Sequence, residues 1–205
     1  HLQLKRALYA VLIVLLLSVV GMTKANAQTG ALNGLFSVND STQVRFSQGN
    51  LQYQASTDTW RFAENQWDFV GEDNANISET YDGWIDLFGW GTGNNPTNTS
   101  EDSADYHEPF NDWGNNAISN GGNTANSGWS TLTNAEWRYV FNTRTGDRYA
   151  KASVAGVSGV ILLPDDWDDS TYTLSSTNIA DANYSSNIIS DTDWPMLKAA
   201  GAVFL

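Results

Sequence analysis

Residues 128–141 read GWSTLTNAEWRYVF and contain the most strongly patterned helix start in the chain. Thr133 is a good N-cap residue, and Glu136 follows it by three positions, so the two form the Thr-x-x-Glu pattern of a capping box. A catalytic acid is the alternative role for Glu136, but such an acid needs a partner carboxylate or base, and the sequence identifies none. We therefore interpret Glu136 as a structural cap.

The residues after this cap predict how the helix is buried. Trp137, Val140 and Phe141 recur at positions i, i+3 and i+4, so their side chains share one face. Arg144 would close the last turn, where a cation favours the helix dipole, and Gly146 would end the helix. The pattern predicts a short helix that packs on a sheet through an aromatic face.

Upstream of this helix, residues 43–63 alternate apolar and polar side chains with the period of β-strands. Val44 and Phe46 alternate in the first segment, and Trp60 and Phe62 alternate in the last. The three segments are QVRF (43–46), LQYQ (51–54) and TWRFA (59–63). Because short polar turns join them, we expect an N-terminal β-meander with one buried face.

The residues after the helix predict further strands. Residues 148–154 and 159–163 fit a β-hairpin, whose second strand is apolar throughout and stops before Pro164. A second short helix fits residues 193–200, and residues 202–205 fit the beginning of a buried strand. Strands and short helices alternate irregularly, without the βαβ periodicity of a parallel sheet, so the sequence predicts the α+β class.

The first 27 residues have the three parts of an export signal. Lys5 and Arg6 precede an apolar run over residues 7–20, and Ala-Asn-Ala at residues 25–27 is a small-x-small cleavage site. A membrane anchor is the alternative, but the apolar run is shorter than the roughly 20 residues that a span needs. We expect residues 1–27 to be a signal peptide, residues 28–205 to form a single domain, and no membrane span to remain after cleavage.

Composition narrows the classes of partner and compartment. The chain has a formal net charge of −13, and loss of the signal, which carries three cations and no acid, makes it −16. Nucleic acids and anionic membrane surfaces bind basic patches, so both are excluded as partners. The chain contains no cysteine, which excludes a lipoprotein anchor, disulfides and thiolate metal sites. An exported chain without cysteine is typical of the Gram-negative periplasm or cell surface.

Four segments taken together resemble exported proteins of Bacteroidota that are related to the Fibrobacter major paralogous domain. They are GWSTLTNAEWRYVF, FSQGNLQYQASTDTWRFA, GWIDLFGWG and GVILLPDDW. The Leu-Thr-x-x-Glu-Trp element at residues 132–137 is similar to a signature of the formylglycine-generating-enzyme-like branch of the C-type-lectin fold. The resemblance implies a C-type-lectin-like domain over residues 28–205 with its closing C-terminal strands absent. The enzyme activity of that branch requires redox cysteines, which this chain lacks.

Residues 71–128 form a long connection that is rich in glycine, asparagine, serine, threonine and aspartate. Long connections inside a domain are usually functional or disordered, and the tryptophans spaced along this one favour an ordered loop region. These rings either pin the loops to the core or stack on a ligand. For the second role we select Trp84, Trp90 and Trp113 as candidate ligand-binding residues, with a glycan or a surface protein as the ligand.

The densest group of carboxylates surrounds Trp167. Calcium takes about six to eight oxygen ligands, and closely spaced aspartates in a loop can supply several of them. The spacing does not match an EF-hand, and a solvated acidic turn is the alternative. The candidate calcium ligands are Asp165, Asp166, Asp168 and Asp169, and we expect no other cofactor.

Taken together, these patterns favour an exported, non-catalytic ligand-binding or adhesion domain at the bacterial cell envelope. Aromatic, asparagine-rich and aspartate-rich loops suit a glycan, which is bound by stacking and hydrogen bonding. Two alternatives remain at this point. One is an envelope hydrolase with a pair of Asp or Glu residues in one cleft, and the other is a purely structural surface domain.

Overall fold

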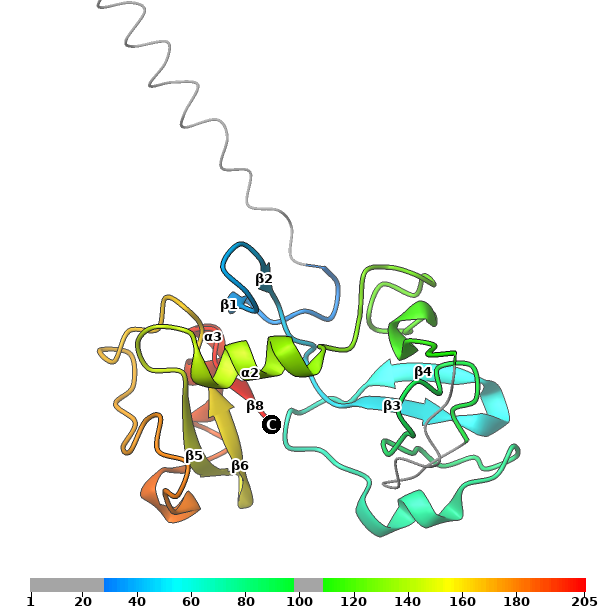
Figure 1. Cartoon of the computed structure of the whole chain (residues 1–205). Helices are drawn as coiled ribbons and strands as arrows, with labels where there is room; N and C mark the ends of the chain where they lie inside the picture. Colours follow the sequence, from blue (N-terminus) through cyan, green and yellow to red (C-terminus); the bar gives the residue numbers. More distant parts are fainter. Residues whose placement is uncertain (1–27, 98–108) are drawn as a thin grey trace, which may run out of the picture.

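The computed structural model describes residues 28–97 and 109–205, and the predicted signal segment 1–27 lies outside the described residues. Figure 1 shows two lobes side by side, with β5, β6, β8, α2 and α3 in one and β3 and β4 in the other. We call the first the sheet lobe (residues 32–46 and 132–205) and the second the hairpin lobe (residues 47–97 and 109–131). Every helix within the described residues is too short or too polar to cross a membrane.

A four-stranded sheet in the order β7-β5-β6-β8 forms the centre of the sheet lobe. Its strands are β5 (Tyr149–Val154), β6 (Val157–Leu162), β7 (Ile188–Ile189) and β8 (Val203–Phe204). β7 runs parallel to β5, whereas β6 is antiparallel to both β5 and β8. The hairpin is confirmed, but β6 begins at Val157 because Ala155 and Gly156 form a two-residue turn. The strand predicted at residues 202–205 is confirmed as β8.

Helix α3 (Trp194–Ala199) contributes to the core on one face of this sheet, at the position predicted for the second helix. Proline occupies its first turn, where the missing N–H removes no helical hydrogen bond, and Gly201 follows its end with a φ of 97°. Alternate β5 side chains point to this face because successive residues of a strand alternate sides. The fully buried members of this cluster are Ala150, Ala152, Val154, Ile161, Leu163, Leu197 and Ala202.

Helix α2 (Asn134–Asn142) begins with the predicted capping box. The backbone N–H of Thr133 donates to Oε2 of Glu136 at 2.7 Å, and the backbone N–H of Glu136 donates to Oγ1 of Thr133 at 3.3 Å. Each side chain thus satisfies a backbone donor that a helix start leaves without an intrahelical partner. The structure confirms that Glu136 is a cap.

The predicted end of this helix is wrong, because α2 ends at Asn142 and not at Gly146. Arg144 leaves the helix and turns its side chain inward, where Nη1 lies 3.1 Å from Oδ1 of Asp165. Nε of Arg144 donates to the carbonyl of Val140 at 2.9 Å, so the cation still binds the carbonyl end of the helix.

The aromatic face of α2 packs as predicted. Val140 is fully buried in a core cluster with Phe36 and Leu162, and the rings of Trp137 and Phe141 pack against that cluster. This cluster lies on the face of the sheet opposite the α3 cluster, since Leu162 belongs to it and neighbouring Ile161 to the other. The sheet therefore carries apolar cores on both faces, as expected of an α+β fold.

The predicted β-meander is only partly correct. The short strands are β1 (Phe36–Ser37), β2 (Gln43–Val44), β3 (Leu51–Gln54) and β4 (Thr59–Phe62). β3 pairs with β4 as predicted, but β2 pairs with β1 in a separate two-stranded sheet. The reason is that the two hairpins pack in different lobes. The ring centroid of Phe46, just after β2, lies 5.6 Å from that of Trp137 in the sheet lobe. The ring centroid of Trp60 in β4 lies 5.2 Å from that of Phe88 in the hairpin lobe.

The described part of the long connection is ordered by single β-bridges and aromatic contacts. Ile85 pairs with Tyr53 of β3, and Ile118 pairs with Trp60 of β4, so the connection lies against both outer edges of the β3–β4 hairpin. Both isoleucines are buried with these aromatic residues. Four 3-10 helices complete the described elements: η1 (Ala55–Thr57), η2 (Gly71–Asn76), η4 (Trp113–Asn115) and η5 (Tyr184–Ser186).

Candidate functional site

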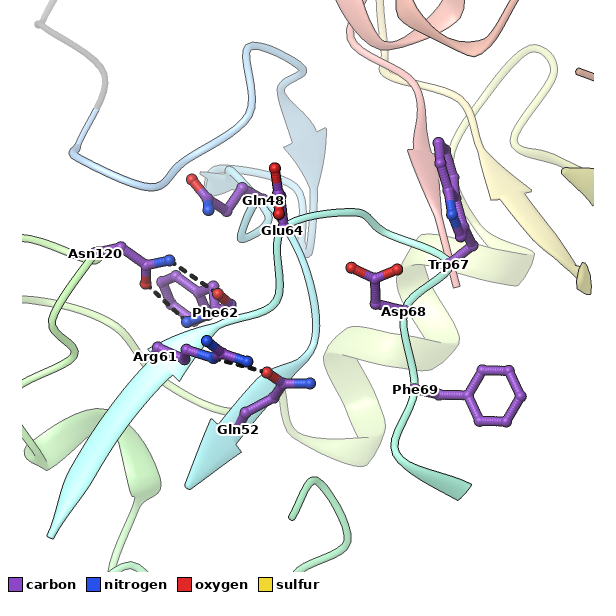
Figure 2. A pocket seen from close by; sticks show the side chains of 9 residues that line it. All are labelled: Gln48, Gln52, Arg61, Phe62, Glu64, Trp67, Asp68, Phe69 and Asn120. Carbon is purple, nitrogen blue, oxygen red and sulfur yellow. Dashed lines mark hydrogen bonds between the residues drawn. The ribbon is translucent and has the colours of Figure 1, made fainter. Parts of the chain in front are cut away.

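A polar pocket of about 560 Å³ lies beside the β3–β4 hairpin. Figure 2 shows that its lining comes from the hairpin, from the segment that follows β4, and from Asn120 of the long connection. The lining residues are Gln48, Gln52, Arg61, Phe62, Glu64, Trp67, Asp68, Phe69 and Asn120. We call this cavity the hairpin pocket.

Arg61 is held in the hairpin pocket by two fixed neighbours. It stands opposite Gln52 in the β3–β4 register, and its Nε donates to Oε1 of Gln52 at 2.9 Å. Its Cζ lies 3.6 Å from the ring centroid of Trp84, so the guanidinium stacks on the indole. Gln52 is only 6% exposed, which restrains it to one position. Strand pairing, a buried amide and an aromatic face therefore orient the cation together.

Arg61 and Gln52 present unused hydrogen-bond donors. Within residues 28–97 and 109–205, Nη1 and Nη2 of Arg61 have no acceptor, and Nε2 of Gln52 has none either. The same residues contain a single ion pair, between Arg144 and Asp165, so Arg61 has no carboxylate within 4.0 Å there. A cation without a counter-ion beside a buried amide marks a place where a ligand can supply acceptors.

Two other polar side chains around the pocket, those of Asn120 and Asp68, are already bonded. Asn120 accepts from the Phe62 N–H at 2.7 Å and donates to the Phe62 carbonyl at 2.8 Å, so it extends the edge of β4 (Figure 2). Asp68 accepts from the backbone N–H of Asn65 at 2.9 Å, which fixes the turn after the hairpin. Glu64 is exposed at the rim, and Phe69 exposes 65% of its surface. The rim thus supplies one free carboxylate and one open aromatic ring.

A second cavity, of about 740 Å³, lies between the two lobes. It is lined by Trp113 and Trp129 from the hairpin lobe and by Trp137 and Phe204 from the sheet lobe. Gln66 also lines it, is 4% exposed, and accepts from the Phe204 N–H at 2.9 Å. Its lining mixes buried apolar side chains such as Phe62 and Val203 with polar residues such as Asn50 and Thr131, so it is an opening at the junction of the two lobes.

The structure does not bring the three predicted tryptophans into one site. Trp84 lies under Arg61 at the hairpin pocket. Trp90 and Trp113 lie together elsewhere, with ring centroids 6.1 Å apart, and Trp90 also packs 5.1 Å from Phe110. Ligand binding by these rings stays a prediction.

Sequence reasoning missed Arg61 and Gln52. The signal that could have found them is the strand alternation itself. It assigns Trp60 and Phe62 to the buried face of the hairpin and therefore places Arg61 on the other face. Adding the hairpin register would have set Gln52 beside Arg61.

The candidate calcium ligands point to different partners. Oδ2 of Asp165 accepts from the Ser37 N–H at 2.9 Å and from Nε2 of Gln43 at 2.7 Å. Asp168 accepts from the Ser170 N–H, and this backbone hydrogen bond lowers the pKa of Asp168. Oδ1 of Asp169 accepts from the indole of Trp167. Within residues 28–97 and 109–205, no group of three or more such side chains is placed to hold a metal ion. Calcium binding stays a prediction.

Comparisons of the chain with protein-family models, with curated proteins and with solved structures found no match.

Proposed function

We propose that this chain is an exported, non-catalytic binding domain of a Gram-negative cell envelope and that it binds a glycan in the hairpin pocket. The observation that carries the proposal is the set of donors on Arg61 and Gln52 that have no acceptor among the described residues and lie beside an open cavity. The hairpin pocket is lined mostly by polar side chains, with Trp67 and Phe69 as aromatic members, and such a mixture suits a ligand that forms hydrogen bonds and also has an apolar face.

Sugar chemistry matches the groups that the pocket offers. Sugar hydroxyl and ring oxygens accept hydrogen bonds from Arg61 and Gln52, and sugar hydroxyls donate to the exposed carboxylate of Glu64. The apolar face of a sugar ring stacks on an exposed aromatic ring, and Phe69 is exposed at the rim. Trp84 then acts behind Arg61 as its support.

The carboxylates of the pocket favour binding over hydrolysis. A glycosidase of the usual kind needs two carboxylic acids that flank one bond. Asp68 accepts hydrogen bonds from the backbone and side chain of Asn65, which leaves Glu64 as the free acid of the lining. Location at the envelope and a C-type-lectin-like fold belong to the same proposal, and they rest on the signal pattern and the family resemblance.

A glycan array probed with the exported chain tests the proposal. We expect binding to a defined set of oligosaccharides, and we expect Gln52→Ala and Phe69→Ala each to weaken it about tenfold, equal to about 1.4 kcal/mol. Phe110→Ala is the matched control, because Phe110 is an exposed aromatic residue outside the hairpin pocket, 42% exposed.

Four outcomes would contradict this proposal. An array without any bound glycan would show that the ligand is not a glycan. Pull-down of a surface protein through the hairpin pocket would show that the ligand is a protein instead. Equal losses for Phe69→Ala and Phe110→Ala would remove the hairpin pocket as the site. Release of shorter sugars from a bound oligosaccharide would replace binding by hydrolysis.

A further inference from the structure

We infer that the hairpin pocket selects glycans that carry a carboxylate, such as oligomers of a uronic acid, and that Arg61 is the residue that recognises this group. The inference rests on the proposed function and specifies its ligand. It depends on three features of Arg61 among the described residues: two nitrogens without an acceptor, a guanidinium plane held by Trp84 and Gln52, and no carboxylate within 4.0 Å.

The free edge of the guanidinium has the geometry that a carboxylate requires. Nε of Arg61 is bound to Oε1 of Gln52 at 2.9 Å, whereas Nη1 and Nη2 have no acceptor within the described residues. Two neighbouring N–H groups of a guanidinium match the two oxygens of a carboxylate, and such bidentate pairs are stronger than neutral hydrogen bonds. A neutral hydroxyl would use only one of these donors at a time.

The plane of the guanidinium is fixed before a ligand arrives. Trp84 stacks on it with 3.6 Å between Cζ and the ring centroid, and Gln52, which is 94% buried, holds its Nε edge. Preorganisation of this kind reduces the entropy lost on binding. Nε2 of Gln52, which also has no acceptor within the described residues, adds a third donor beside the free edge.

Within the part of the chain that the structure describes, no carboxylate forms an ion pair with Arg61. Glu64 and Asp68 line the same pocket, but neither has a carboxylate oxygen within 4.0 Å of the Arg61 nitrogens. Asp68 is bonded to Asn65, and Glu64 is exposed to water, which screens it. A ligand carboxylate is the group that would complete an ion pair at this position.

Isothermal titration with a matched pair of probes tests the inference. The probes are tri-galacturonic acid and its fully methyl-esterified form, which share one sugar skeleton and differ in charge. We expect the acid to bind at least tenfold more tightly than the ester, and we expect Arg61→Gln to abolish this preference. Arg61→Lys should abolish most of it, because an ammonium keeps the charge but lacks the planar fork.

Trp84→Leu separates a positioning role from a merely structural one. If Trp84 holds the plane of Arg61, this change lowers the ratio of acid affinity to ester affinity, which a uniform loss of folded protein would leave unaltered. Arg138→Gln is the charge control, because Arg138 is an exposed cation of α2 outside the hairpin pocket, and it should leave the ratio unchanged.

The outcomes distinguish this inference from the proposed function. Equal affinity for acid and ester, unaltered by Arg61→Gln, would overturn the inference and leave glycan binding standing. No binding of either probe, with no glycan bound on the array, would overturn both. If Arg61→Gln lowers the unfolding temperature, the ratio of acid affinity to ester affinity is taken from Arg61→Lys, because lysine keeps the positive charge and the aliphatic stem.

Discussion

Asp165, one of the four candidate calcium ligands, also connects distant segments of the chain. Its side chain, 24% exposed, accepts hydrogen bonds from the Ser37 backbone and hydroxyl, from Gln43, and from the guanidinium of Arg144. Burial alone would raise the pKa of Asp165, but these hydrogen bonds outweigh it and lower the pKa. Arg144 is 3% exposed at its side chain, and burial lowers its own pKa. The pair joins β1 and β2 to the end of α2.

We predict that Asp165→Asn lowers the free energy of unfolding by about 2–3 kcal/mol at pH 7. The change leaves Arg144 buried without its counter-ion, which is more costly than the loss of an exposed ion pair. Arg144 also donates to three backbone carbonyls, and these hydrogen bonds make the loss smaller than that of a buried charge without any partner. Urea unfolding measures the difference, with Asp166→Asn as the exposed control, expected within about 0.5 kcal/mol of the wild type.

The pH dependence of this difference follows from the lowered pKa of Asp165. A carboxyl whose folded-state pKa is depressed contributes stability above its ordinary value of 3.8, and that stability is lost as the pH falls through the lower folded-state pKa. Wild type and Asp165→Asn should therefore differ fully above about pH 5 and converge below that ordinary pKa. A difference that is unchanged at low pH would contradict this assignment.

At the scale of the element, the turn between β5 and β6 carries a conformation that its first residue disfavours. Ala155 has a φ of 49° and Gly156 a φ of 83°, the two positive values of a type I′ hairpin turn. A side chain with a Cβ resists the left-handed region, and only glycine, asparagine and aspartate enter it readily. The strand patterns on either side are strong enough to hold Ala155 there.

We predict that Ala155→Asn raises the free energy of unfolding by about 0.5–1 kcal/mol, because Asn-Gly is the favoured pair of this turn type. Gly156→Ala is the matched opposite and should destabilise the hairpin, since a Cβ there is strained although the surrounding space is open. Thermal unfolding of both variants checks the signs. Two changes of the same sign would show that the turn is not held at positive φ.

At the scale of the whole molecule, the side chain of Gln66 joins the two lobes, because its amide oxygen accepts a hydrogen bond from the edge of β8 as the carbonyl of a neighbouring strand would. Gln66 follows the β3–β4 hairpin and is 4% exposed, and its Oε1 accepts from the Phe204 N–H at 2.9 Å on the outer edge of β8. Trp67 packs against the core cluster of the sheet lobe from the same segment. This short segment therefore couples the lobes across 138 residues of sequence.

We predict that Gln66→Leu destabilises the fold by about 1–3 kcal/mol, because the Phe204 N–H would be left buried without an acceptor. Gln48→Leu is the matched control, since Gln48 is only half-buried. Urea unfolding measures the loss, and limited proteolysis of residues 63–70 reports whether the lobes separate. A stable Gln66→Leu variant that resists proteolysis would show that the hydrogen bond does not couple the lobes.

The sequence by itself determined the elements whose signals are local. The capping box of Thr133 and Glu136, the apolar face of α2 and the β5–β6 hairpin were all predictable, because each depends on residues close together in the chain. The α+β class followed from the irregular order of these elements. The buried alternation of Trp60 and Phe62 was equally readable.

Only the tertiary structure decided which elements share a core and where side chains from distant segments meet. Sequence alternation cannot tell that β2 pairs with β1 and not with β3, because pairing depends on the core that each strand joins. It also cannot place Trp84 under Arg61, or Asp165 against Arg144, since these contacts cross loops of unpredictable path. The candidate site is built from such contacts. Burial and pairing, which are set by the folded chain, bring Asp165 against Arg144 and leave two nitrogens of Arg61 without an acceptor among the described residues.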